Sequence, residues 1–306
     1  MSSENKELSI KGSKSGIKIA SCLIVFVVSA IVGIGIRYLQ TVKFIDSKTG
    51  FYTGGEALSV VLYAILAVAV LFFCGVCFLS ADSKKISIGE SRNKWASVGS
   101  ALFAVSLLGD AYYCISVGMS RSGAVGSVYT DMMKSGALPL LIQSISALFA
   151  AVYFFILASD FSKGTAKAYK RKILATVPVV WAGSRLILRF LRQISFVQVS
   201  DLLLELVMIA FMILFFMALA QTASGVYKDT FKWRIPAFGL SAALIAAVTS
   251  VPRMIVALTA REFVNSSHPF SLNDFLFVIF ILTLLVKIKA DAEKTAAVSA
   301  EYTESE

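Results

Sequence analysis

The strongest constraint on this chain is a succession of eight long apolar segments. Each is close to the length of about 20 residues that an α-helix needs to cross the hydrocarbon core of a bilayer. The polar connections between them are too short to fold as separate soluble domains. The segments are 18–40, 56–80, 95–118, 138–159, 173–192, 202–221, 235–258 and 272–288. The sequence therefore predicts an all-α fold, a polytopic membrane helix bundle with eight transmembrane helices.

The composition excludes an ordinary soluble protein. Apolar types make up 57% of the 306 residues and charged types 16%, whereas a soluble domain has about 25% charged residues. The net charge of +10 comes from basic residues in short blocks between the apolar segments. That placement is a signal of membrane topology and not of a nucleic-acid interface. We therefore expect a lipid bilayer as the surroundings and no nucleic-acid partner.

The last segment is the weakest of the eight, because its apolar centre covers only 275–286. A re-entrant hairpin in place of a full crossing, which would leave seven spans, stays open at this point. Ser271, three residues before Asp274 and followed by an apolar run, resembles the capping box of a helix start.

The distribution of lysine and arginine predicts which side of the membrane each connection faces. Of the 29 basic residues, 19 fall on one side when the spans alternate, and cytoplasmic loops hold the excess. Both termini are therefore expected in the cytoplasm, and the protein in the plasma membrane. Residues 1–17 form a polar cytoplasmic start, and the acidic tail 290–306 is expected to be a frayed helix or disordered.

Charged residues inside the spans gather in the half that this topology places outside. A charge at the centre of a membrane helix costs about 2.5–3.5 kcal/mol on insertion scales, so each one needs a reason. At a rise of about 1.5 Å per residue, the outer half contains Arg37, Asp110, Arg185, Arg189, Glu205 and Arg253. These six residues are the candidate ligand-binding site.

The spacing of these charges indicates which of them pair. Asp110 has a short side chain that cannot reach water, so it needs a cationic partner, and Arg185 lies at a compatible depth. Arg185, Arg189 and Arg192 fall on one stripe of a helix, and Glu205 in the next span is within reach of Arg189 or Arg192.

Two functional hypotheses follow from this cluster. Arginine exceeds carboxylate in it, and guanidinium groups bind anions bidentately. An outward pocket for a small anionic ligand, in a transporter or ligand-binding protein, is the first hypothesis. In the alternative, the chain is a non-transporting sensor or assembly component, and the intramembrane ion pairs only hold helices together.

Two prolines predict irregularities near the charged level. Pro178 should free the backbone carbonyl of Leu174, and Pro252 that of Val248, which gives bends in the fifth and seventh spans. The hydroxyls of the preceding Thr249 and Ser250 are expected to bond the carbonyl freed by Pro252.

We find no sequence pattern for catalysis. The chain has no nucleophile motif, phosphate loop or metal-ligand spacing, so we expect no enzyme activity, no cofactor and no metal site. Its four cysteines all lie in apolar segments and imply no disulfide framework. The oligomeric state does not follow from the sequence.

The connection after the first span has the most distinctive sequence. It contains Ile45-Asp46, then Thr49-Gly50-Phe51-Tyr52, and Arg37 precedes it. From the residues alone, this stretch is a turn that anchors the first helix hairpin. With Arg37, the Ile-Asp-x-x-Thr-Gly-Phe-Tyr pattern resembles a group of uncharacterised bacterial multi-pass membrane proteins. The resemblance implies a bacterial plasma membrane and supplies no reaction, ligand or catalytic residue.

Overall fold

The computed structural model describes residues 2–44, 54–79, 91–122, 137–165, 171–191, 199–224, 233–259 and 272–304. These residues form eight α-helices and one π-helical turn, with no strand among them. The elements are α1 (Ser2–Leu39), η1 (Gln40–Phe44), α2 (Glu56–Phe78), α3 (Lys94–Ser122), α5 (Ala137–Lys163), α7 (Lys172–Leu191), α8 (Val199–Ser224), α9 (Arg234–Thr259) and α10 (Leu272–Glu304). The loop with the Ile-Asp-x-x-Thr-Gly-Phe-Tyr pattern lies mostly outside the described residues.

The predicted all-α membrane bundle is confirmed. Each expected segment coincides with one helix. All of these helices except α10, seven in number, are long and apolar enough to cross a bilayer. The helix α10 does not meet the same criterion. It nevertheless runs without a break from Leu272 to Glu304 and does not turn back as a re-entrant hairpin would. Whether α10 crosses the membrane stays a prediction.

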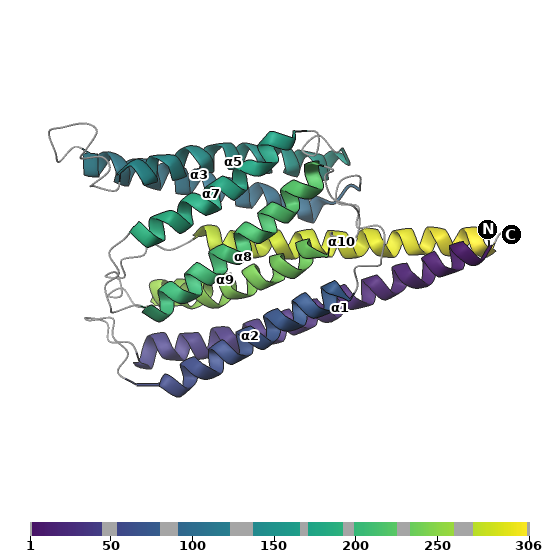
Figure 1. The fold of residues 1–306 in the computed structure, drawn as a ribbon, viewed down its shortest axis with the longest axis horizontal. Coiled ribbons are helices and arrows are strands. Elements are labelled where there is room, and N and C mark those ends of the chain that lie inside the picture. The colour runs from purple at the N-terminus through teal and green to yellow at the C-terminus, as the bar shows by residue number, and fades with distance from the viewer. Residues whose placement is uncertain are drawn as a thin grey trace.

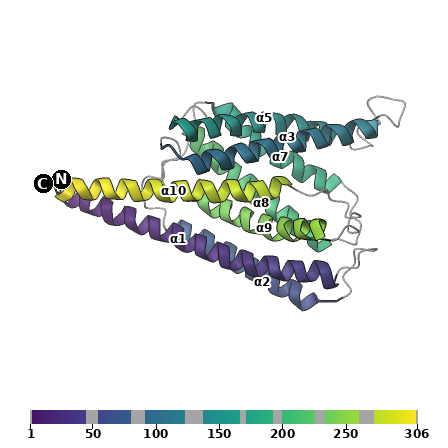
Figure 2. The same ribbon diagram turned by 180° about the vertical axis from the view of Figure 1, so that it is seen from behind.

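The first and last helices are longer than expected. The helix α1 begins at Ser2 and not near residue 18, and α10 continues to Glu304. Of the two alternatives predicted for the tail, a frayed helix or disorder, the structure has a helix over 290–304. The start of α1 and the end of α10 lie side by side at one end of the bundle, beyond the other helices (Figures 1 and 2).

Six helices pack in a closed ring. In order around it, the neighbours are α3, α5, α7, α8, α9 and α10, and α10 packs back on α3. The helices α1 and α2 lie outside this ring, against α9, and α1 also contacts α10 (Figure 1). In the most apolar part of each helix, 89% of the residues of α9 are buried inside the bundle, but only 28% of those of α2. The helix α9 is therefore the central helix of the bundle, and α2 is a peripheral one.

Aromatic side chains fill the inside of the ring. The ring of Phe103 on α3 contacts those of Phe154 on α5, Trp181 on α7 and Phe216 on α8, with centroids 4.8, 6.1 and 6.4 Å away. It also stacks on Phe280 of α10 at 5.6 Å. All of these side chains are fully buried. Such pairs add about 0.5–1.5 kcal/mol each beyond their area burial, so this cluster holds five helices together.

Glycine allows two of the ring contacts to be close. A Cβ atom added at Gly99 on α3 would lie 2.2 Å from Oγ1 of Thr283 on α10. A Cβ added at Gly239 on α9 would lie 3.1 Å from the ring of Phe215 on α8. At Gly109, also on α3, the same addition meets nothing within 4 Å. The contact of α3 with α10 therefore requires glycine at position 99.

The serine and threonine hydroxyls before Pro252 do not bond the carbonyl that was expected. Thr249 Oγ1 donates to the carbonyl of Ile245 at 2.9 Å, and Ser250 Oγ donates to that of Ala246 at 2.6 Å. A hydroxyl on a helix reaches back three or four residues, which puts the Val248 carbonyl out of range of both. The proposed rebonding of the Val248 carbonyl was wrong.

Candidate functional site

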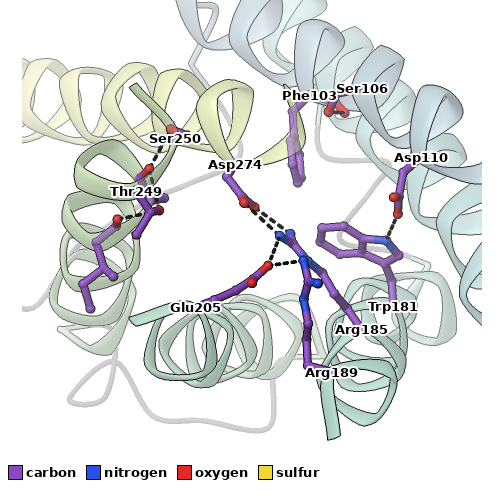
Figure 3. A network of polar contacts seen from close by, with 12 residues as sticks. Phe103, Ser106, Asp110, Trp181, Arg185, Arg189, Glu205, Thr249, Ser250 and Asp274 are labelled. Atoms are coloured by element: carbon purple, nitrogen blue, oxygen red, sulfur yellow. Dashed lines mark hydrogen bonds and ion pairs between the residues drawn. The ribbon is translucent and has the colours of Figure 1, made fainter. Parts of the chain in front are cut away.

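Arg185 on α7 is the centre of a buried ion network at one end of the ring. Its two terminal nitrogens donate to the two carboxylate oxygens of Asp274 on α10, at 2.6 and 2.8 Å. The same guanidinium lies 3.6 Å from Oε1 of Glu205 on α8. The exposed fractions are 6% for Arg185, 3% for Asp274 and 2% for Glu205. The helices α7, α8 and α10 are therefore joined by the buried bidentate pair of Arg185 with Asp274 and by the contact of Arg185 with Glu205 (Figure 3).

Arg189, one turn further along α7, completes the network. Its guanidinium donates to Oε1 of Glu205, so the pairing of these two residues, which the sequence predicted, is confirmed. Because Glu205 lies in the second turn of α8 and Arg189 in the last turn of α7, the carboxylate faces both arginines. We call Arg185, Arg189, Glu205 and Asp274 the outer network, after the side of the membrane predicted for it.

Asp110 is near this network but has other partners. Its Oδ2 accepts hydrogen bonds from Nε2 of Gln143 on α5 and Nε1 of Trp181 on α7, both at 2.9 Å. Its Oδ1 lies 4.0 Å from the thiol of Cys114. Within the described part of the chain no cation is bonded to Asp110, so the expected ion pair with Arg185 was wrong. The guanidinium of Arg185 instead engages Asp274 with both terminal nitrogens.

The indole of Trp181 connects the two groups. It donates its N–H to Asp110 and has the guanidinium of Arg185 over its ring, 5.8 Å from the centroid. Trp181 and Arg185 are four residues apart on α7 and so lie on the same face. Figure 3 shows Asp110, Trp181 and Arg185 side by side, with Phe103 of the aromatic core next to them.

Charge in the outer network is balanced, which differs from the excess of arginine that the sequence suggested. Arg185 and Arg189 face Glu205 and Asp274, two guanidinium groups for two carboxylates. The sequence suggested too few carboxylates because Asp274 was not among the predicted site residues. With Asp274 in place, both guanidinium groups already have carboxylate partners.

Arg37 lies at a different place. It is on α1, on the opposite side of α9 and α10 from α7 (Figure 1). Its guanidinium donates to Oε1 of Gln40 at 2.9 Å, and the amide of Gln40 donates to Oγ of Ser59 on α2 at 3.1 Å. Arg37 is thus part of the joint between the first two helices. The structure does not bring it together with Arg185.

Arg253 is the last residue of the predicted site, and Arg192 was predicted only as an alternative partner of Glu205. Arg253 is half-buried in the last turns of α9, a helix that packs on α8 and α10. Arg192, which was considered as a partner of Glu205, lies outside the described residues.

Three residues of this region were missed as site residues from the sequence. Asp274 was considered only as part of a helix-start pattern with Ser271, which lies outside the described residues. Its position at the outer start of a span, level with Arg185, was the signal available. Trp181 and Gln143 carry no charge, so a search for charged residues passes over them.

A second buried polar group lies at the opposite end of the bundle. The ammonium of Lys287 on α10 is fully buried, bonds Oδ2 of Asp291 at 2.8 Å and lies 5.2 Å from the ring centroid of Phe161 on α5. The other oxygen of Asp291 accepts a hydrogen bond from Ser91. We call Ser91, Phe161, Lys287 and Asp291 the inner cluster. Lys287 lies at the end of the predicted segment 272–288 and is one of the basic residues that the predicted topology assigns to the cytoplasmic side.

The described residues offer ionic and hydrogen-bonding groups but no metal-ligand set. No group of three or more histidine, cysteine, aspartate or glutamate side chains suited to a metal ion occurs among them. The outer network can hold helices together and can respond to a change in the charge of one of its members.

Comparison with known proteins gave no match. No protein-family model matches the chain, and no curated protein or solved structure does. Its function must therefore be inferred from its own residues.

Proposed function

We propose that the chain is a non-transporting component of a membrane, a sensor or an assembly partner, in which the outer network is a lock between helices α7, α8 and α10. In this proposal the protein is not an enzyme and lies in the plasma membrane with both termini in the cytoplasm. The observation that carries the proposal is the bidentate bond of Arg185 with Asp274, because it occupies the group that an anionic ligand would need.

Burial supports a structural role for the pair. Removing one member of a buried ion pair leaves an unpaired charge and costs about 3–5 kcal/mol. Opening the Arg185 site to an anion would expose the carboxylate of Asp274, which is 3% exposed and bonded by both of its oxygens. An incoming anion would have to replace an intramolecular carboxylate that is already in place.

An uptake experiment tests this proposal. The purified chain is reconstituted into liposomes, and the flux of a panel of radiolabelled carboxylates and phosphates is measured. The lock predicts the same flux as protein-free liposomes. A flux above that level would contradict the proposal if Arg185→Gln abolishes it and Lys289→Gln, at a half-buried position of α10, retains it.

A transporter or binding protein for a small anion is the second candidate. It is favoured by Arg189, whose side chain is 14% exposed and is the most accessible guanidinium of the outer network. An anion that binds Arg189 would compete with Glu205. The uptake experiment therefore includes Arg189→Gln as a separate variant.

Labelling tests the proposed topology. The connections 45–53 and 166–170 lie on opposite sides of the membrane in the predicted topology. A single cysteine in each, in a background without the four native cysteines, should react with an impermeant maleimide from outside only at 45–53. Labelling at 166–170 in intact cells would reverse the orientation.

A further inference from the structure

Asp110 is the one carboxylate in this part of the bundle whose negative charge no described cation neutralises by a direct bond. Its neighbours Glu205 and Asp274 are bonded to guanidinium groups, whereas Asp110 has an amide, an indole and a thiol as partners. The five charged groups Arg185, Arg189, Glu205, Asp274 and Asp110 include three carboxylates and two guanidinium groups. The excess charge in this group is therefore negative.

The two oxygens of Asp110 differ in their surroundings. Oδ2 accepts two good hydrogen bonds at 2.9 Å, from Gln143 and Trp181. Oδ1 has the weak thiol donor of Cys114 at 4.0 Å. A proton on Oδ1 would leave both bonds to Oδ2 unchanged, because a protonated carboxyl group still accepts at its other oxygen.

A second carboxylate oxygen nearby, Oε2 of Glu205, also has no strong donor among the described residues. Oε2 of Glu205 is buried and has no hydrogen-bond partner among the described residues, and Glu205 as a whole is 2% exposed. Its other oxygen, Oε1, faces the guanidinium groups of Arg185 and Arg189. Among the described residues, both Asp110 and Glu205 therefore have one carboxylate oxygen without a strong donor.

The surroundings of Asp110 make a proton the ligand that fits. The helix α3 packs on α5 and α10, and α7 supplies Trp181. The charged groups that these helices bring to the outer network are Arg185 and Arg189 on α7 and Asp274 on α10, and α5 contributes the uncharged Gln143. No described cation is bonded to Asp110, so a proton can add at Oδ1 without displacing a cation.

We infer that Asp110 is a proton-binding site, and that Oδ1 takes up one proton from the aqueous phase while Oδ2 keeps its bonds to Gln143 and Trp181. The step neutralises one negative charge, breaks no covalent bond of the chain and changes the acceptor of the indole N–H from an anion to a neutral carboxyl. It does not depend on the lock proposed above, because Asp110 is bonded to no member of the outer network among the described residues. If the outer network is not a lock between helices, the inference of a proton-binding site at Asp110 is unaffected.

Trp181 reports directly on this step. The chain has three tryptophans, and Trp95→Phe with Trp233→Phe leaves Trp181 as the only one. In this background the full chain in lipid nanodiscs is titrated from about pH 4 to about pH 9, the range around and above the ordinary carboxyl value, and the Trp181 emission is recorded. The expected result is a shift of the emission with a single midpoint.

Two variants decide whether the signal belongs to Asp110. In Asp110→Asn the emission should be independent of pH and close to the acid form of the parent. If that variant does not fold, Gln143→Leu is the second test: it removes one donor to the ionised form, so the midpoint should rise by about one pH unit. A pH-independent emission in the parent would overturn the inference. An unchanged titration in Asp110→Asn, or an unchanged midpoint in Gln143→Leu, would do so as well.

A salt series separates a proton from a metal cation. At constant pH the emission of the parent should not change when sodium replaces potassium. A response to sodium without a response to pH would show an alkali-cation site and would overturn the proton site.

Discussion

The outer network and the inner cluster both bury charge on α10, one at the start of the helix and the other near its middle, yet they do so in different ways. In the outer network each ion pair joins two helices: Arg185 of α7 with Asp274 of α10, and Arg189 of α7 with Glu205 of α8. In the inner cluster Lys287 pairs with Asp291 of its own helix, one turn away. Ion pairs therefore join helices in the outer network, whereas the inner cluster joins α10 to other parts of the chain through the hydrogen bond from Ser91 to Asp291 and the contact of Lys287 with the Phe161 ring. The two groups should differ in what the loss of an ion pair costs.

The largest effect is expected for Asp274→Ala. This change leaves the buried guanidinium of Arg185 without its bidentate partner and should lower the free energy of unfolding by about 3–5 kcal/mol. The control on the same helix is Glu293→Ala, whose carboxylate is 57% exposed and pairs with the ammonium of Lys289. Its loss should be at most about 1 kcal/mol. Unfolding in mixed detergent micelles measures both, and equal losses would remove the distinction between the buried pair and the exposed one.

A smaller loss is expected for Glu205→Gln. The amide keeps the shape of the carboxylate but replaces two charge-assisted contacts with weaker ones, so the loss should be about 2 kcal/mol. Glu56→Gln is the control, because Glu56 is exposed in the first turn of α2. That control should unfold like the parent. A Glu205→Gln variant as stable as the control would show that Arg189 and Arg185 do not depend on Glu205.

The packing of α3 on α10 is tested by Gly99→Ala. A Cβ at this position would overlap Oγ1 of Thr283 at 2.2 Å, so the helices must move apart. The expected loss is about 1–3 kcal/mol. Gly109→Ala on the same helix meets nothing within 4 Å and should not lower stability. Thermal melts of the two variants side by side check this, and a melt of Gly99→Ala that matches Gly109→Ala would contradict the close contact.

The smallest effect is expected for Lys287→Met. Methionine has a similar length and fills the same buried space, and replacing a buried charge by an apolar group of similar volume is often neutral or stabilising. Asp291 keeps its bond to Ser91 and its access to water. A change of within about 1 kcal/mol is expected in the same unfolding assay. A loss as large as that of Asp274→Ala would mean that the inner cluster also locks helices.

The sequence predicted the helices well and the partners of their charges only in part. Apolar length is a local property, so eight segments matched eight helices to within a few residues at most ends. The pairing of Glu205 with Arg189 was also predictable, because the two lie on consecutive helices joined by a short connection. The inner pair of Lys287 with Asp291 has the spacing of four residues that favours contact on a helix, and it could have been found in the same way.

The bond between Arg185 and Asp274 could not be predicted, because 89 residues separate them in the chain and their contact depends on the order of helices in the ring. The partners of Asp110 were missed for a related reason. Helix neighbours that are far apart in the sequence, here α5 and α7, supply neutral donors that a search for charges does not detect. Pairing by membrane depth alone suggested Arg185, which Asp274 already engages.

A double-mutant cycle across Arg185 and Asp274 tests most directly whether this pair locks α7 to α10. The free energy of unfolding is measured for the parent, Arg185→Gln, Asp274→Asn and the double variant. A lock predicts that the double variant is more stable than the sum of the two single losses allows, with a coupling energy of about 2–3 kcal/mol. Losses that add to within about 0.5 kcal/mol would show that the two side chains do not hold each other, and would contradict the account.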